Sequence, residues 1–330
     1  MSERPKVMVT GASGFFGATM MEHLSGEDVI GVTRNTDTEI AERLGLKKLD
    51  VGSKEDTAQF IHDQLPETIF HFYGVSRPKE VAENPLVAKT ANIDSVLNIL
   101  GAIHNARKKF TNYNPCVVVS GSVEQIGDSK KSEQILDETS PRNPQNLYAT
   151  QKQEMSETFL SLCQKLNIDG YVVLQGPATG SSPSGEVSQS LGFLIPDMAA
   201  QIAILEQGET DGVVITGNIN HKRNIVNIND AIASYIALAT KKPISGEYLV
   251  CADKSVALSH VLKVMIENAK INLTHQVDSS RGFGKATDRY YTHQKITTAT
   301  GWKPKTSIEE TAIDVLNFQR KQLRELDGVR

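Results

Sequence analysis

Short apolar runs alternate with longer segments of helical periodicity through the first half of the chain. Runs of this length that are rich in β-branched residues are typical of buried parallel strands. The expected strands are residues 6–10, 29–33, 47–50, 68–72, 116–119 and 171–174, and the expected helices are 15–24, 53–65, 85–103 and 148–166. Repeated β-α units of this kind predict an α/β fold with a doubly wound parallel sheet and right-handed crossovers.

The turn after the first strand carries three glycines at a spacing of three, Gly11, Gly14 and Gly17. In such a turn the first glycine allows a sharp bend, the second a close approach to a pyrophosphate, and the third close packing of helix on sheet. The N–H groups at the start of the following helix then form an anion site. The alternative is a glycine-rich turn without a ligand. Because a strand precedes the turn and a helix follows it, the pattern favours a dinucleotide-binding Rossmann fold.

The alternation is lost after Leu174, where residues 176–192 are rich in Gly, Ser and Pro and predict a long loop. The pattern then predicts a helix at 194–207, a strand at 213–216, and helices at 230–240, 258–270 and 307–326. We therefore expect a Rossmann domain over residues 1–175. Residues 176–330 are expected to form mainly a smaller C-terminal substrate-binding lobe, with segments around 211–235 returning to the sheet. A pocket is expected between this lobe and the cofactor.

Composition narrows the class of partner. The 330 residues carry a formal net charge of -4, which argues against nucleic acid or a membrane surface as a main partner. No segment is expected to be long and apolar enough to span a bilayer, and no room for a secretory signal precedes the first strand. The three widely spaced cysteines are typical of reduced, buried thiols in a cytoplasmic protein. The histidines show no metal spacing; we expect no metal site and interpret His71 as a packing residue.

An acid–base group is expected near the carboxyl end of the fifth strand, where Ser122 and Glu124 lie. Tyr148 and Lys152 are four residues apart on one face of a predicted helix. The ordinary pKa of tyrosine is about 10, and a nearby ammonium is expected to lower it. Together with Ser122, this pair would suit a carbonyl/alcohol interconversion beside a hydride carrier. A second pair with the same spacing, Tyr291 and Lys295, is interpreted as a surface helix pair.

These landmarks together resemble the extended short-chain dehydrogenase/reductases that act on nucleotide sugars. The resemblance covers residues 6 to about 305, in the family's order. It is carried by the Thr10–Gly17 turn, the Ser122, Tyr148 and Lys152 set, Asp50, His71, Asn92 and Gly301-Trp302-Lys303-Pro304. It implies that Ser122 and Tyr148 hydrogen-bond the C4 oxygen of the sugar, with Tyr148 as acid or base, while Lys152 binds the nicotinamide ribose. The dinucleotide contacts that it implies are Gly11, Ser13, Gly14, Phe15, Phe16, Gly17, Asp50, Val51, Tyr73 and Lys152.

A narrower resemblance is to GDP-4-keto-6-deoxy-mannose reductases and, less closely, GDP-mannose 4,6-dehydratases. It rests on the segments 192–202, 217–219 and 223–230. It implies that Ser76, Ser122, Tyr148, Asn218 and Arg223 contact the substrate, with Arg223 at the diphosphate, where a guanidinium is well suited. The chain departs from the family at Gly121 and Ile126, at Phe72-Tyr73-Gly74, and near 175–178, where a family Arg and Asn have no match.

We favour NADPH-dependent reduction of a 4-keto group on a nucleotide-linked, GDP-type 6-deoxysugar. The alternatives are a 4,6-dehydratase, which would use Glu124 beside the serine, a C4 epimerase, and a dinucleotide sensor without catalysis. Arg34, at the end of the second strand, has the charge and shape for a 2′-phosphate and favours NADP over NAD; Asp37 comes late for the competing role. The family resemblance also implies a homodimer formed by the helices at 85–103 and 148–166.

Overall fold

The central feature of the computed structural model is a seven-stranded sheet in the order β12-β7-β5-β4-β1-β2-β3. The structure describes residues 6–128, 133–208, 211–281 and 287–328. All the strand pairs in this sheet are parallel, which confirms the doubly wound α/β fold expected from the sequence. The strands are β1 (Val7–Thr10), β2 (Val29–Thr33), β3 (Lys47–Lys48), β4 (Thr68–His71), β5 (Cys116–Ser120), β7 (Gly170–Gln175) and β12 (Gly246–Val250).

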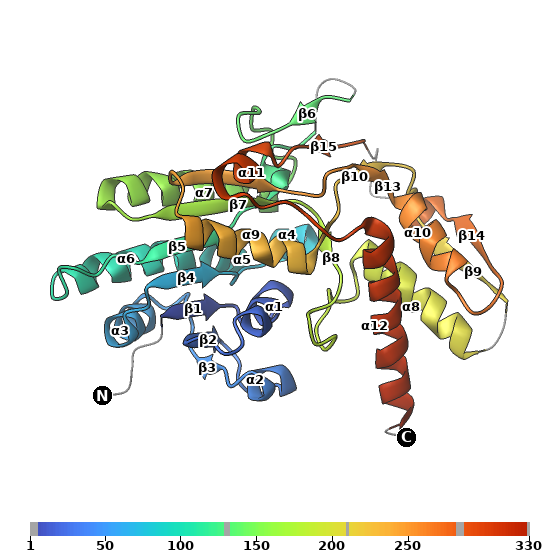
Figure 1. The fold of residues 1–330 in the computed structure, drawn as a ribbon, viewed down its shortest axis with the longest axis horizontal. Coiled ribbons are helices and arrows are strands. Elements are labelled where there is room, and N and C mark those ends of the chain that lie inside the picture. The colour runs from blue at the N-terminus through green and yellow to red at the C-terminus, as the bar shows by residue number, and fades with distance from the viewer. Residues whose placement is uncertain (1–5, 129–132, 209–210, 282–286, 329–330) are drawn as a thin grey trace.

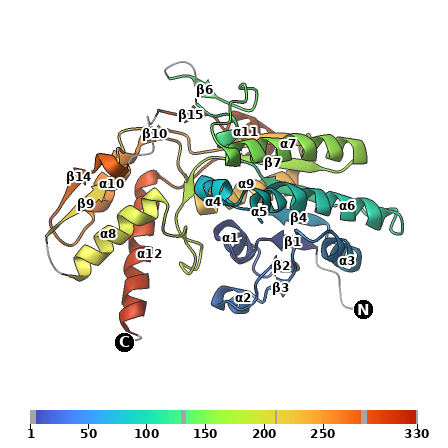
Figure 2. The same ribbon diagram turned by 180° about the vertical axis from the view of Figure 1, so that it is seen from behind.

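Helices cover both faces of the sheet, and each face has its own apolar core. Successive residues of a strand point to opposite faces, so Met8 lies in one core and Val9 in the other. Figure 1 looks onto the face covered by α1 (Phe15–His23) and α9 (Ile228–Lys241), and Figure 2 onto the opposite face. The second face is covered by α3 (Lys54–Gln64), α6 (Ser95–Arg107) and α7 (Leu147–Leu166).

One continuous helical segment runs from Pro85 to Arg107. It joins α5 (Pro85–Lys89), a π-helical turn η1 (Thr90–Asp94) and α6. By length and composition alone this segment could cross a membrane, so the expectation that no such segment exists is wrong. Its apolar content has another explanation in the fold, because 56% of its most apolar stretch is buried inside the protein, where Ile99 and Ile103 pack in the sheet core.

The C-terminal lobe has a third apolar core, to which Ile202, Val261 and Leu316 belong. Figure 1 shows this lobe beside one end of the sheet, next to the short strand β8. It is built from α8 (Leu194–Gln207), β9 (Gly212–Thr216), α10 (Leu258–Glu267), β14 (Leu273–Val277) and α12 (Ile308–Gly328).

Part of the segment expected to return to the sheet does so. The expected returning segment, 211–235, includes β9, which instead pairs with β14 in the lobe. The return is made by α9, which packs in the sheet core through Ile232 and Tyr235, and by β12, which pairs with β7. The split of the chain at residue 175 stays a prediction.

Short elements connect these parts. They are α2 (Glu39–Arg43), α4 (Pro78–Glu83), η2 (Val123–Gln125), β6 (Ile135–Leu136), β8 (Ala178–Thr179), β10 (Lys222–Arg223), β11 (Val226–Asn227), β13 (Val256–Ala257), η3 (Ser279–Arg281), β15 (Tyr290–Tyr291) and α11 (Gln294–Thr300). The loop expected at 176–192 is present apart from β8 and one bridge between Ser181 and Ser188.

The loop is fixed at two positions by carboxylates from distant helices. Asp314 of α12 accepts hydrogen bonds from the backbone N–H and the hydroxyl of Ser181. Glu22 of α1 accepts the same pair of bonds from Ser184. The loop is therefore hydrogen-bonded both to α1 and to the C-terminal helix α12.

Candidate active site

The glycine turn between β1 and α1 has the shape that a dinucleotide requires. Gly11 has a positive φ of 63°, and a Cβ there would come within 2.7 Å of the Tyr73 backbone nitrogen. A Cβ on Gly17 would lie 2.2 Å from the Gly11 carbonyl oxygen, so only glycine fits either position. Gly14 caps α1 without a side-chain hydrogen bond, which leaves the first N–H groups of the helix available to a phosphate. The turn therefore fits a pyrophosphate.

Residues at the ends of β2 and β3 form a second group beside the turn. Ser13 Oγ lies 2.8 Å from Thr33 Oγ1, and the exposed Arg34 follows directly. Burial raises the pKa of Tyr73, while the charge of Arg34 lowers it and that of Asp50 raises it, so the phenol lies close to both groups. Their position beyond the carboxyl ends of the strands suits the adenosine half of a dinucleotide.

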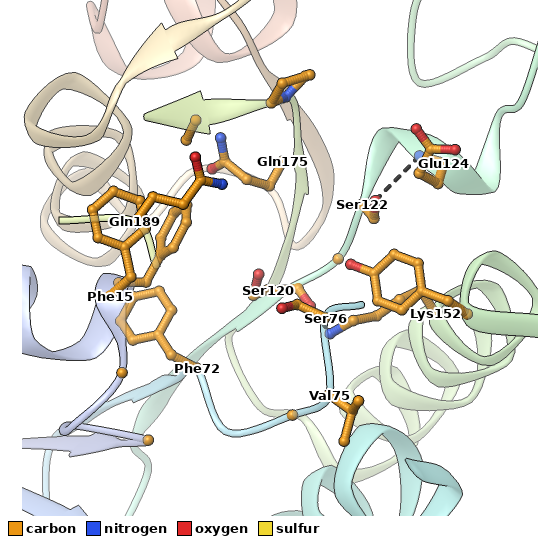
Figure 3. A pocket seen from close by; sticks show the side chains of 18 of the residues that line it. Phe15, Phe72, Val75, Ser76, Ser120, Ser122, Glu124, Lys152, Gln175 and Gln189 are labelled. Carbon is orange, nitrogen blue, oxygen red and sulfur yellow. Dashed lines mark hydrogen bonds between the residues drawn. The ribbon is translucent and has the colours of Figure 1, made fainter. Parts of the chain in front are cut away.

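A cavity of about 480 Å³ extends from the glycine turn to the end of β5. Many of the site residues expected from the sequence line it, namely Gly11, Gly14, Phe15, Phe16, Gly17, Ser76, Ser122, Glu124, Tyr148 and Lys152. Figure 3 shows Ser76, Ser120 and Lys152 together on one side and Ser122 with Glu124 nearby. Arg34, Asp50, Val51 and Tyr73 lie outside this lining, on the adenosine side.

Local capping places the acid–base residues. Ser122 caps η2, and its Oγ accepts a hydrogen bond of 3.2 Å from the Glu124 backbone N–H. Asn146 caps α7 through a 2.9 Å bond from the Ala149 N–H to its side-chain oxygen, which sets Tyr148 in the first turn of the helix.

The ionisation of Tyr148 differs from the expectation based on its helical spacing from Lys152. Burial raises the pKa of Tyr148 to about 12, a hydrogen bond with Ser122 lowers it, and the charge of Glu124 raises it. The Lys152 ammonium donates a 2.7 Å hydrogen bond to the Ser120 carbonyl oxygen, and burial lowers its own pKa to about 8. The expected lowering of the tyrosine pKa by the lysine is therefore not found here. The phenol is protonated at neutral pH.

Asn92 supports the wall of the cavity below Lys152. Its side-chain oxygen accepts a 2.8 Å bond from the Val75 N–H, and its amide donates a 3.0 Å bond to Gln151 in α7. A Cβ on Gly74 would lie 2.8 Å from the same Asn92 oxygen, so a larger residue here would displace the Asn92 amide. His71 is buried between Thr10 (2.9 Å) and Ser95 (3.1 Å).

A second cavity of about 440 Å³ is lined by residues of the C-terminal half, together with Asp128 from the loop after η2. Asn218 and Arg223, both expected to contact substrate, line it together with His221, Arg281 and Arg289. Arg223 donates to the backbone carbonyls of Lys222 and Thr287. Three arginines around one cavity suit a ligand with a diphosphate. Sequence reasoning missed Arg281 and Arg289, because they follow β14 and precede β15, far along the chain from the other site residues.

Arg289 connects the two cavities. Its side chain is 10% exposed and pairs with Glu124, and with Asp128 at 2.8 Å. Glu124, which the sequence placed beside the serine as an acid or base, is thus bound to a guanidinium from the C-terminal lobe.

Tyr291 is not part of a surface helix pair, contrary to the interpretation from the sequence. It lies in β15 with only 4% of its surface exposed, whereas Lys295 belongs to α11. Burial raises the pKa of Tyr291 to about 12, and the nearby Arg289 lowers it. The helix begins only after His293, so the tyrosine and the lysine do not share a helical face.

Within the described ranges of the chain, no group of three His, Cys, Asp or Glu side chains could hold a metal ion. The three cysteines are free and buried.

Comparison with known proteins gives matches along nearly the whole chain. GDP-6-deoxy-D-mannose reductase of Pseudomonas aeruginosa is 23% identical over 323 residues, which are 97% of this chain and 99% of that protein. UDP-glucose 4-epimerase of Lactobacillus helveticus is 25% identical over 325 residues, 91% of this chain and 92% of that protein.

Solved structures of similar fold include RMD from Pseudomonas aeruginosa complexed with NADPH, with a TM-score of 0.82, 19% identity and coverage of 97% and 98% of the two chains. The UDP-glucose 4-epimerase of Stenotrophomonas maltophila, with bound NAD and formylated UDP-arabinopyranose, has a TM-score of 0.81 at 17% identity and coverage of 97% and 99%. Residues 7–251 match the NAD dependent epimerase/dehydratase family. The chain therefore belongs to this family, the extended short-chain dehydrogenase/reductases, and is an NAD(P)-dependent oxidoreductase of the class that acts on nucleotide sugars.

Proposed function

We propose that the protein reduces the C4 keto group of a GDP-linked 4-keto-6-deoxysugar with NADPH. The observation that favours this proposal over a 4,6-dehydratase is the pairing of Glu124 with Arg289. 4,6-Dehydration oxidises C4 and then eliminates water across C5 and C6, which needs a carboxylate near the sugar that is free to take or give a proton. Glu124 occupies the position for that role, but it is held in an ion pair with Arg289, whereas ketone reduction needs no such group.

The proposed reaction assigns a role to each residue of the first cavity. When bound, NADPH supplies the hydride to C4 of the sugar. Ser122 donates a hydrogen bond to the C4 oxygen, and Tyr148 gives that oxygen its proton as the alcohol forms. The phenol of Tyr148, whose pKa burial raises to about 12, carries the proton that this step transfers. Lys152 is placed to turn from the Ser120 carbonyl to the nicotinamide ribose.

The second cavity is proposed to hold the nucleotide. Arg223 and Arg289 would meet the diphosphate, Asn218 would lie near the base, and Ser76 would contact the sugar. Glu124 is then a positioning group for Arg289. The proposal of guanine as the base rests on the similarity to the Pseudomonas GDP-6-deoxy-D-mannose reductase. The epimerase relative, by contrast, is named for a UDP-sugar.

NADP(H) is the proposed cofactor. The exposed Arg34 supports it, as does the similar structure with NADPH, although other neighbours hold NAD. We also propose a homodimer formed by the helices at 85–107 and 147–166. Leu86 is 78% exposed and Val87 is 62% exposed. These apolar side chains on the first helix support a contact there with a second subunit. The free, buried cysteines support a reducing, cytoplasmic location.

The decisive experiment incubates the protein with GDP-mannose alone, and separately with the 4-keto-6-deoxy derivative of GDP-mannose plus NADPH. Consumption of NADPH with the keto sugar is expected, and Tyr148→Phe should lower the rate by about 10² to 10⁴-fold, the usual contribution of a general acid. Glu124→Gln should leave the pH profile of kcat unchanged. Keto sugar formed from GDP-mannose without added NADPH, and lost in Glu124→Gln, would instead identify a dehydratase. Interconversion of C4 epimers would identify an epimerase, and dinucleotide binding without any turnover would indicate a sensor.

A further inference from the structure

The side chain of Gln175 is buried with an unsatisfied oxygen at the end of β7. Only 9% of the residue is exposed. Its amide nitrogen donates to the carbonyl oxygen of the adjacent Gly176 at 3.0 Å, while its carbonyl oxygen has no hydrogen-bond partner among the residues that the structure describes. Leaving a buried acceptor without a hydrogen bond carries a free-energy cost. Such a cost calls for an explanation, and a ligand that supplies the missing donor is one.

The position of Gln175 in the sheet indicates which part of a dinucleotide it faces. It lies at the carboxyl end of β7, next to β5, which leads into Ser122. Arg34 follows β2. In the sheet, β2 and β5 lie on opposite sides of β1. A dinucleotide with its pyrophosphate on α1 therefore has its adenosine over β2 and its nicotinamide over β5 and β7. Gln175 belongs to the nicotinamide end of the first cavity, which it lines.

A second carboxamide, Gln189, lies at the same end of the cavity. Figure 3 shows the side chains of Gln175 and Gln189 near Phe15, across the cavity from Ser122 and Glu124. Gln189 comes from the loop over the cavity, and both of its neighbours are held. The Ser188 hydroxyl donates to the Gly180 carbonyl at 2.7 Å, and Ser190 accepts a 2.9 Å bond from Arg77.

We propose that Gln175 and Gln189 bind the carboxamide of the nicotinamide ring and so fix which face of the ring is turned toward Tyr148. A carboxamide presents one acceptor and one two-proton donor, and glutamine offers the complementary set. The terminal torsion of glutamine is broad, so Gln175 can turn its unsatisfied oxygen to the ligand at little cost. Anchoring the carboxamide blocks rotation of the ring about its bond to the ribose, so a single hydride position faces the sugar. This inference rests on the dinucleotide part of the proposed function.

The test compares two dinucleotides that differ only at the carboxamide. In the 3-acetylpyridine analogue of NADP⁺ a methyl group replaces the amide nitrogen, so the acceptor is kept and the donor is lost. Titration calorimetry should show NADP⁺ binding about threefold to tenfold more tightly than the analogue, the effect of one hydrogen bond. Gln175→Leu should abolish this difference. Gln153→Leu, on the solvent side of α7 where its amide pairs with Glu157, should preserve it.

A second ligand and a second variant keep the result decisive. Adenosine 2′,5′-bisphosphate lacks the nicotinamide, so its affinity should be the same in wild type and Gln175→Leu. If Gln175→Leu does not fold, Gln189→Leu on the loop decides, with a reduced preference expected. A preference for NADP⁺ that survives in the folded variant would overturn the proposal, and so would wild-type protein that does not distinguish the two dinucleotides. Wild type that shows the preference but leaves the keto sugar unreduced would support this inference and contradict the proposed reaction.

Discussion

Burial decides the ionisation of the groups at the centre of the first cavity. It raises the pKa of Tyr148 to about 12 and lowers that of Lys152 to about 8, because a low-dielectric site disfavours the charged form of each. Residue types and spacing identified this pair. The direction of the tyrosine shift depended on where the ammonium points, and it points to the Ser120 carbonyl, which no sequence pattern encodes.

His71 provides a test of folding stability at the residue scale. Burial lowers its pKa to about 3, against an ordinary value of 6.5. Between these values the unfolded chain binds a proton that the folded protein does not. The free energy of unfolding should therefore fall as the pH drops below 6.5, by about 1.4 kcal/mol per pH unit from this group. Urea unfolding of wild type and His71→Gln between pH 7 and 4 measures the difference in slope.

The exposed His104 of α6 is the matched control, because His104→Gln should retain the wild-type slope. Equal slopes for wild type and His71→Gln would show that His71 does not contribute to acid sensitivity.

Arg34 provides a test of cofactor choice. Arg34→Asp should weaken NADPH binding by about tenfold to a hundredfold, since a charge-assisted contact to phosphate is lost and a carboxylate replaces it. NADH, which lacks the 2′-phosphate, should bind as before or better. Fluorescence titration with both dinucleotides measures this, with Lys54→Asp in α3 as a control for the change in net charge. Equal losses for NADPH and NADH would show that Arg34 does not contact the 2′-phosphate.

At the scale of elements, the sequence predicted the positions of helices and strands that capping residues and apolar periodicity determine. Ser53 caps α3 by accepting a 3.3 Å bond from the Asp56 N–H, as its place before the apolar pattern indicated, and β5 and α8 lie where the periodicity placed them. The sequence pattern did not distinguish β9, which stays in the lobe, from β12, which joins the sheet, because both are short strands that differ in their pairing partners. Pairing between distant strands is decided by tertiary packing.

Residues 189–193 form a cover over the first cavity. The sequence predicted this part of the chain only as a long loop. In the structure Arg77, which caps α4, donates to the Leu191 carbonyl at 2.6 Å and to Ser190 at 2.9 Å, and its guanidinium lies over the Phe193 ring. One side chain therefore joins two segments that line the cavity, 75–78 and 189–193.

Removing this contact should open the cover. Arg77→Ala is expected to speed NADPH dissociation by about tenfold, the loss of roughly 1.4 kcal/mol from partly exposed hydrogen bonds. Stopped-flow displacement of bound NADPH measures the rate. Lys79 lies two residues away, and its side chain is 87% exposed and pairs with Glu83 in the same helix; the Lys79→Ala variant should release NADPH at the wild-type rate. An unchanged rate in Arg77→Ala would mean that the loop does not limit release.

At the scale of the whole molecule, Arg289 joins the two halves of the chain. It reaches from just before β15 to Glu124 and Asp128 after β5, so one charged contact links the linings of the two cavities. A guanidinium that is 10% exposed needs such partners, because burying an unpaired charge is costly. No sequence signal linked these residues, which lie more than a hundred positions apart. The network follows from the fold that brings the C-terminal lobe over the sheet.

The proposed homodimer is the last property that belongs to this scale. Leu86 and Val87 are strongly exposed on α5, and an exposed apolar pair on a helix is expected to be covered in an assembly. Leu86→Glu should shift the mass measured by analytical ultracentrifugation from that of a dimer toward that of a monomer, since a buried unpaired carboxylate disfavours the interface. Val277→Glu is the matched control, because Val277 is 50% exposed in β14 of the C-terminal lobe, outside both proposed interface helices, and should leave the mass unchanged. A wild-type monomer at all concentrations would contradict the dimer, and a dimer that persists in Leu86→Glu would place the interface elsewhere on the surface.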